Sequence, residues 1–114
     1  MSGRNLDLLL YIQQSIARIE GYTLDGRDAF LSQNVLQDAV LRRLETLADA
    51  AGRLSPALKA RHPHIPWRDI SGFRNVAAHG YLELDVTRVW TTVQAHLPAL
   101  KAAVEEELHQ APDP

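Results

Sequence analysis

The distribution of proline constrains this chain more than any other feature of its sequence. All six prolines lie at or after Pro56, and Leu and Ala together make up 32 of the 114 residues. Both features favour helix, because Leu and Ala have high helix propensity and an interior proline breaks a helix. No segment shows the alternation of apolar and polar residues that is typical of a half-buried strand. The sequence therefore predicts an all-α fold.

Apolar residues recur at helical spacing in segments bounded by turn and capping residues. The expected helices cover about 5–20, about 27–51 with Asp28 as N-cap, a short stretch from Ser55-Pro56 that ends before His62-Pro63, a stretch from Pro66 to near Gly80, and a last helix after Asp85. Pro98 lies inside the last helix, where we expect a bend or a local irregularity. The prediction is a bundle of four main helices plus a short helix, in a single domain over residues 1–110 with 111–114 as a C-terminal tail.

Composition narrows the classes of function. The formal net charge of −2 argues against a general nucleic-acid coat, although it leaves room for a small local site. The absence of cysteine excludes disulfides, thiolate metal sites and cysteine nucleophiles. We find no apolar run near the ~18 residues of a membrane span and no signal-peptide core, so we expect no membrane association, and a cytoplasmic location is compatible.

The segment from Arg74 to Tyr81 carries most of the reactive chemistry. It places Arg74, Asn75, His79 and Tyr81 within eight residues, beside a glycine at a helix end. Cleavage of RNA without metal needs a group that deprotonates the 2′-hydroxyl, a group that protonates the leaving 5′-oxygen, and positive charge on the phosphorane. Histidine can move the protons, arginine can hold two phosphate oxygens, and Asn75 could orient either group.

The spacing of this motif leaves two questions open. Positions five apart on an ideal helix differ by roughly 140° around its axis, so Arg74 and His79 would not share a face. Either the helix breaks before His79, or the two groups converge from different protomers of a symmetric dimer. By itself, an R-x4-H match also fits an ordinary charge pair at a helix C-terminus.

Other polar and aromatic residues have simpler interpretations. His62 and His64 flank Pro63, but two imidazoles without an assigned carboxylate make a weak metal site, so we expect a solvent-exposed loop and no metal. The acidic run 105–107 indicates a solvated helix end. Trp67 and Trp90 lie on core stripes, which favours packing over stacking on bases.

Blocks along nearly the whole chain resemble the HepT-like ribonuclease family, the toxin half of a two-gene toxin–antitoxin pair within the HEPN group. The blocks are Arg27-Asp28-Ala29-Phe30-Leu31, 39–45, 54–56, 65–70, Arg74-Asn75, His79-Gly80-Tyr81, Asp85 with Val89-Trp90, and 97–100. Their order and spacing make the resemblance specific.

This resemblance implies an all-α, HEPN-like bundle that forms a homodimer, with an R-x4-H-x-Y motif lining a cleft between protomers. It implies a type VII-like toxin that cleaves RNA, such as tRNA or mRNA, without metal or cofactor, with Arg74 and His79 as the catalytic pair. Tyr81 would be the site at which the cognate minimal nucleotidyltransferase antitoxin (MntA-like) attaches AMP and silences the toxin.

Two positions depart from the family pattern. Ala48-Asp49 stands where the family often has Gly-Glu, and Arg43 stands where it often has Asn. These differences shorten one carboxylate and add one charge on a helix that could line the cleft. The alternative function is a non-catalytic helical dimer that binds a nucleotide or a partner nucleotidyltransferase, because an intact motif does not prove turnover.

Overall fold

The computed structural model describes the backbone of residues 3–79 and 85–110, and the side chains of 3–75 and 85–110. Within these ranges the regular structure is entirely helical, which confirms the all-α prediction. The helices are α1 (Gly3–Tyr22), α2 (Arg27–Ser32), α3 (Asn34–Gly52), α4 (Pro56–Ala60), α5 (Trp67–His79) and α6 (Val86–Gln110). None of them is long and apolar enough to span a membrane.

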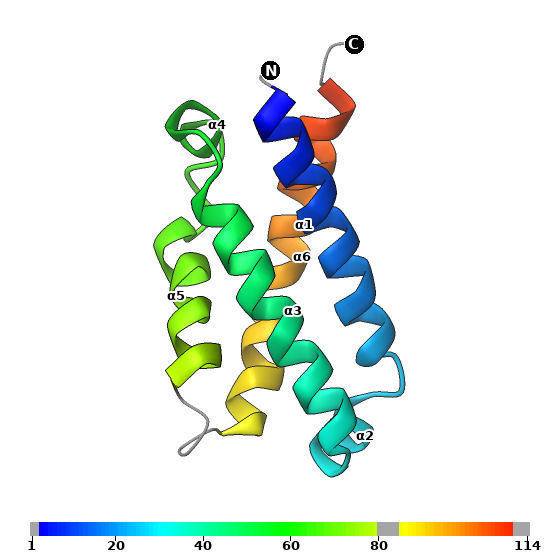
Figure 1. The fold of residues 1–114 in the computed structure, drawn as a ribbon. Helices are drawn as coiled ribbons and strands as arrows, with labels where there is room; N and C mark the ends of the chain where they lie inside the picture. The colour runs from blue at the N-terminus through cyan, green and yellow to red at the C-terminus, as the bar shows by residue number, and fades with distance from the viewer. Residues whose placement is uncertain (1–2, 80–84, 111–114) are drawn as a thin grey trace.

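Four long helices run side by side, and two short ones close the ends of the bundle (Figure 1). α3 packs against both α1 and α5, and α6 packs against α1. α4 lies at the end where α1 begins and α6 finishes, whereas α2 lies at the opposite end. Each long helix contributes to one apolar core, which includes Leu9, Ile16, Val40, Leu47, Ile70, Val93 and Leu100. Trp67 and Trp90 pack against this core, as their spacing predicts.

The single helix expected over 27–51 is wrong, because the chain breaks at Gln33. This residue adopts an extended conformation, with φ −122° and ψ 107°, between α2 and α3. The amide of Gln37 donates to the carbonyl oxygens of Phe30 and Leu31 at 3.0 and 3.1 Å, so a side chain satisfies carbonyls that the helix leaves unpaired. The N-cap of α2 is Gly26, at φ 96°, and Asp28 lies inside the first turn instead.

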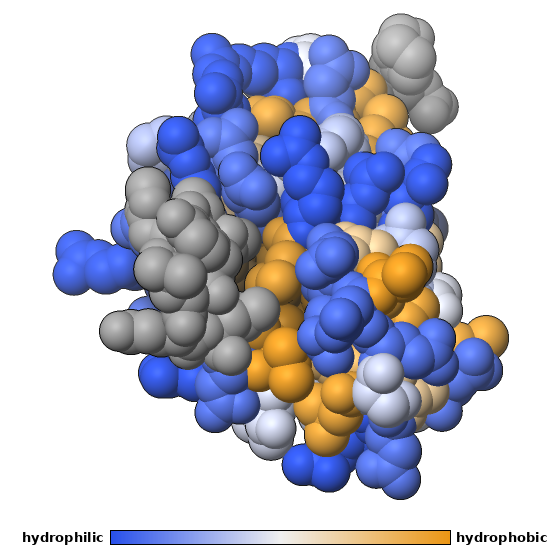
Figure 2. Space-filling model, turned by 60° about the horizontal axis from the view of Figure 1, so that its bottom comes forward, coloured by the Kyte–Doolittle hydropathy of each residue, from blue (hydrophilic) through white to orange (hydrophobic). Residues whose placement is uncertain are grey.

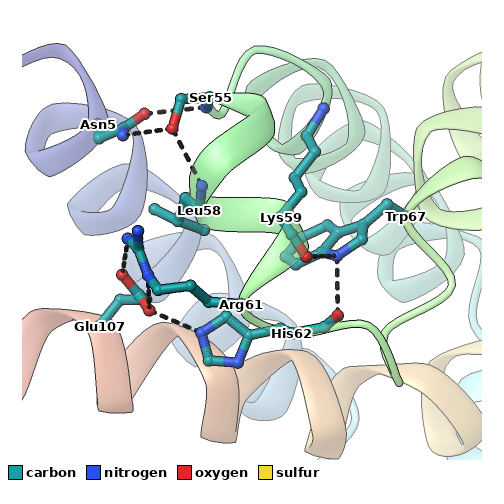
Figure 3. A network of polar contacts seen from close by, with 8 residues as sticks. All are labelled: Asn5, Ser55, Leu58, Lys59, Arg61, His62, Trp67 and Glu107. Atoms are coloured by element: carbon teal, nitrogen blue, oxygen red, sulfur yellow. Dashed lines mark hydrogen bonds and ion pairs between the residues drawn. The ribbon is translucent and has the colours of Figure 1, made fainter.

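Ser55 caps α4 as the Ser-Pro pair predicts. Its hydroxyl accepts from the backbone N–H of Leu58 at 3.2 Å, and Pro56 occupies the first helical position. Asn5 of α1 adds two bonds: its amide donates to the Ser55 hydroxyl at 2.9 Å, and its carbonyl accepts from the Ser55 N–H at 3.1 Å (Figure 3). The cap therefore ties α4 to α1.

The prediction of an exposed loop at His62 is wrong, and so is that of a wholly solvated acidic run. The side chains of His62 and Glu107 are only 3% and 4% exposed, with His62 Nε2 2.7 Å from Glu107 Oε2. Arg61 donates to both oxygens of the same carboxylate, from Nε at 3.1 Å and Nη2 at 2.6 Å (Figure 3). Glu107 therefore anchors the end of α4 to α6. His64, Glu105 and Glu106 are exposed as expected.

Asp85 caps α6, with its carboxylate accepting from the backbone N–H groups of Thr87 and Arg88 at 3.0 and 3.3 Å. The helix then continues through Pro98 without an interruption. Its buried positions, such as Val89, Val93 and Leu97, follow the spacing of four and three that the sequence shows.

Candidate functional site

Arg74, the arginine of the predicted motif, projects from α5 toward α3. Its Nη1 lies 3.4 Å from Oδ1 of Asp49, and the Arg74 side chain is 64% exposed. The second carboxylate oxygen of Asp49 accepts from Nε of Arg53 at 3.0 Å. Asp49 thus lies between two guanidinium groups, one from its own helix and one from α5.

The close packing of α3 on α5 brings these groups together. Asp49 and Arg53 are four residues apart on α3 and so share one face of that helix. At the end of α3 the chain has no side chain at Gly52, where an added Cβ would lie 3.4 Å from the hydroxyl oxygen of Ser71 on α5. This distance is an ordinary van der Waals contact, so α3 and α5 pack closely here, and that packing places Arg74 within reach of Asp49.

A surface hollow of about 480 Å³ lies beside the Asp49–Arg74 pair. Its lining comes from α1, α3 and α5, namely Leu8, Tyr11, Glu45, Thr46, Asp49, Ala50, Arg53 and Arg74. One part of the wall is apolar or aromatic, and the rest is charged. Such a mixture suits a ligand that has both a flat apolar part and an anionic part.

The structure places the other predicted site residues less completely. Asn75 is exposed on α5, next to Arg74. His79 is the final residue of α5, so the alternative in which the helix breaks before His79 is wrong. Tyr81 lies outside the described residues. Of the predicted site, the structure therefore describes the environment of Arg74 and Asn75.

Three residues of the hollow were not singled out as site residues from the sequence: Tyr11, Asp49 and Arg53. The i,i+4 spacing of Asp49 and Arg53 predicts that they share a helix face. It does not say that this face meets Arg74, which depends on how α3 packs on α5. For Tyr11, the one feature of the sequence that could indicate a binding role is that this aromatic residue lies outside the apolar stripe of the first helix. Within the described residues, no three His, Cys, Asp or Glu side chains gather as they would around a metal ion.

Comparison with known proteins gives one consistent family. The model of the family described as "Ribonuclease HepT-like" matches residues 12–107. A protein named "Probable ribonuclease HepT" from Thermococcus cleftensis is 34% identical over 107 residues, which cover 93% of this chain and 97% of that protein. A protein of Methanocaldococcus jannaschii named "Putative RNase" is 29% identical, with coverage of 92% and 98%.

A longer relative carries the same region beside a further part. It is the "Gamma-glutamylcyclotransferase and putative RNase" of Methanocaldococcus jannaschii, 34% identical over 84% of this chain. The matched region makes up only 44% of that protein. No solved structure gives a significant match to this chain. The family model matches most of the chain, and the Thermococcus cleftensis protein aligns with it over nearly the whole length of both. The chain therefore belongs to the HepT-like ribonuclease family.

Proposed function

We propose that this protein is the toxin of a type VII-like toxin–antitoxin system and acts as a metal-independent RNA endonuclease. The observation that carries the proposal is the position of Arg74. Its exposed guanidinium borders a hollow at the α3–α5 packing surface, in a chain of the HepT-like ribonuclease family. His79 follows five positions later on the same helix.

The proposed reaction needs only groups that this chain can supply. One His79 takes the proton of the RNA 2′-hydroxyl, whose oxygen attacks the adjacent phosphorus. The bond from phosphorus to the 5′-oxygen breaks, and a second imidazole protonates that oxygen as it leaves. The products are a 2′,3′-cyclic phosphate and a free 5′-hydroxyl. Arg74 stabilises the extra negative charge on the phosphorane, because a guanidinium can donate to two phosphate oxygens at once.

Helix geometry supports a site shared by two protomers. Because α5 continues to His79, positions 74 and 79 are separated by about 140° around the axis and about 7.5 Å along it. A twofold axis beside α5 would bring Arg74 of one copy toward His79 of the other and would supply two imidazoles. Apolar surface for association lies at the α2 end of the bundle, where Figure 2 shows an apolar patch among hydrophilic side chains. Leu24 and Val35, 81% and 77% exposed, belong to the segments at this end.

Silencing would act through Tyr81. An MntA-like minimal nucleotidyltransferase would transfer AMP to its phenol, two residues from His79. The phosphate of that AMP would compete with RNA for Arg74, because both ligands present the same oxygens to the guanidinium. One modification would thus both occupy the cleft and neutralise the charge that binds substrate.

The test is cleavage of RNA by the purified, unmodified protein in EDTA. We expect wild type to cut tRNA or mRNA, and the variants Arg74→Ala and His79→Ala to leave it intact while remaining folded. Arg68→Ala is the matched control, since it removes an exposed arginine from the first turn of the same helix. Uncut RNA with wild type, together with tight binding of the nucleotidyltransferase, would favour the non-catalytic module instead.

A further inference from the structure

We infer that the hollow beside Arg74 is a nucleotide subsite: Arg53 holds one phosphodiester of a single-stranded RNA, and Tyr11 stacks on the neighbouring base. The inference rests on the proposed function, because it extends the RNA path from Arg74 across α3 to α1. It assigns binding roles to two side chains that lie outside the R-x4-H-x-Y motif.

The phosphate side of the subsite is a pair of guanidinium groups joined by Asp49. Arg53 uses Nε for Asp49 and Arg74 uses Nη1, so other N–H donors of both groups remain for a ligand. Both arginine side chains are more than half exposed, at 56% and 64%. The Asp49 carboxylate holds the two guanidinium groups near one another. N–H donors from two helices, α3 and α5, are therefore already in place for an anion.

The charge of this side fits one phosphodiester. Two arginines and Asp49 carry a formal charge of +1 together. Glu45, the other carboxylate of the lining, lies 3.4 Å from Arg42, which balances its charge. An RNA linkage carries a single negative charge, so it neutralises the Arg–Asp–Arg group. A triphosphate would bring more negative charge than the Arg–Asp–Arg group neutralises.

The base side of the subsite is formed by α1. Tyr11 is 36% exposed although it is a large aromatic residue, and Leu8 and Ala50 provide apolar surface in the same lining. A flat base can stack on a tyrosine ring whatever its identity. A volume of about 480 Å³ lies in the range of small-molecule sites. Binding of an anion alone would not explain the apolar wall of the hollow, whereas binding of a nucleotide with its base would.

Binding of an RNA that cannot be cleaved tests the subsite directly. The probe is a fluorescent 2′-O-methyl oligonucleotide of about eight nucleotides, within the usual footprint of single-strand sites. Its blocked 2′-oxygen prevents the proposed reaction. We expect Tyr11→Ala and Arg53→Ala each to weaken binding about tenfold in fluorescence anisotropy, and Tyr11→Phe to bind like wild type because the ring remains.

Two further measurements separate binding from structural damage. Arg53→Ala should reduce the slope of log K against log salt by about 0.7, since one phosphate contact is lost, whereas Tyr11→Ala should leave the slope unchanged. Arg53→Lys should keep that slope because it keeps the charge. The matched control is Arg27→Ala, an exposed arginine at the opposite end of the bundle, which should bind within twofold of wild type (Figure 1).

The outcomes distinguish this inference from the proposed function. If Tyr11→Ala and Arg53→Ala both bind the probe within twofold of wild type, the subsite is wrong, even where wild type cleaves RNA. If wild type fails to cleave RNA but binding depends on Tyr11 and Arg53, the subsite stands and the nuclease proposal falls. Displacement of the probe by AMP at equal concentration would overturn the RNA assignment in favour of a free nucleotide.

Discussion

The carboxylate of Asp49 meets the guanidinium of Arg74 where α3 packs on α5, with Oδ1 3.4 Å from Nη1. The contact joins the arginine of the motif to a residue 25 positions earlier in the chain. Both groups are substantially exposed, so the pair contributes little to folding stability. Its value lies in orienting Arg74 toward the hollow, and this role makes a distinctive prediction.

Asp49→Asn should lower kcat and strengthen RNA binding at the same time. The amide no longer holds Arg74 by charge, and an exposed pair worth ~0.2–1 kcal/mol corresponds to a loss in rate of at most about fivefold. Loss of a negative charge beside the phosphate should lower KM. Steady-state cleavage of RNA gives both constants, and a general loss of structure would not lower KM.

Glu45→Gln is the control for the combined fall in kcat and KM that we expect of Asp49→Asn. It removes the same charge from the same hollow, but its carboxylate pairs with Arg42 rather than Arg74. We expect a lower KM without loss of kcat. If Asp49→Asn and Glu45→Gln change kcat equally, Asp49 does not position Arg74.

Glu107→Gln should destabilise the fold. The glutamate accepts from two nitrogens of Arg61 and contacts buried His62 at 2.7 Å. An amide has one acceptor oxygen in place of two and loses the charge, so a buried polar group loses its partner at a cost of about 1–3 kcal/mol. Urea unfolding gives the free energy. Glu106→Gln, the exposed neighbour, should remain within about 0.5 kcal/mol of wild type.

The carboxylate of Glu107 should also make the free energy of unfolding depend on pH in the acidic range. The hydrogen bond from Arg61 lowers the pKa of Glu107, burial opposes this, and the hydrogen bond with His62 lowers it further, so the net pKa is below its usual value. A depressed folded pKa means that the stabilisation is present above the unfolded pKa and is lost as the pH falls through the folded one.

The difference in unfolding free energy between wild type and Glu107→Gln should therefore be present at about pH 5 and shrink below the unfolded glutamate pKa of about 4.3. Urea titrations of both proteins at a series of pH values measure it. A difference that is equally large near pH 3 would show that charge at Glu107 is not its source.

The sequence predicted most of the fold because the signals for it are local. Apolar spacing marked the helices, and Ser55 and Asp85 marked two of their starts. The break at Gln33 has no proline or glycine to announce it. The Gln37 amide that satisfies the free carbonyls of α2 belongs to α3, and the sequence does not show that contact.

Contacts between residues that lie far apart in the sequence could be predicted much less well. His62 and Glu107 are 45 residues apart, and an acidic run does not itself reveal which carboxylate turns inward. Glu107 does continue the apolar stripe of Leu100 and Val104 at spacings of four and three, which is the signal that marks it as inward-facing. Of the site, the motif supplied Arg74. Its partner Asp49 followed only from the packing of α3 on α5.

The proposed sharing of the site between two protomers predicts that two inactive variants restore each other. A dimer of one Arg74→Ala chain and one His79→Ala chain keeps one arginine and one histidine, on different protomers. If those two groups act together across the twofold axis, mixing the variants through a refolding step should recover a small but detectable part of wild-type RNA cleavage, while each variant alone stays inactive. The recovery is only partial because the mixed dimer has one imidazole instead of two, so water must protonate the leaving 5′-oxygen. If Arg74 and His79 of one chain act together, every site in the mixed dimer lacks one of them and no activity returns. The refolding control mixes each variant with a chain that carries Arg74→Ala and His79→Ala together, along with the neutral surface change Glu106→Gln. That mixed dimer never holds both an Arg74 and a His79, so it should stay inactive.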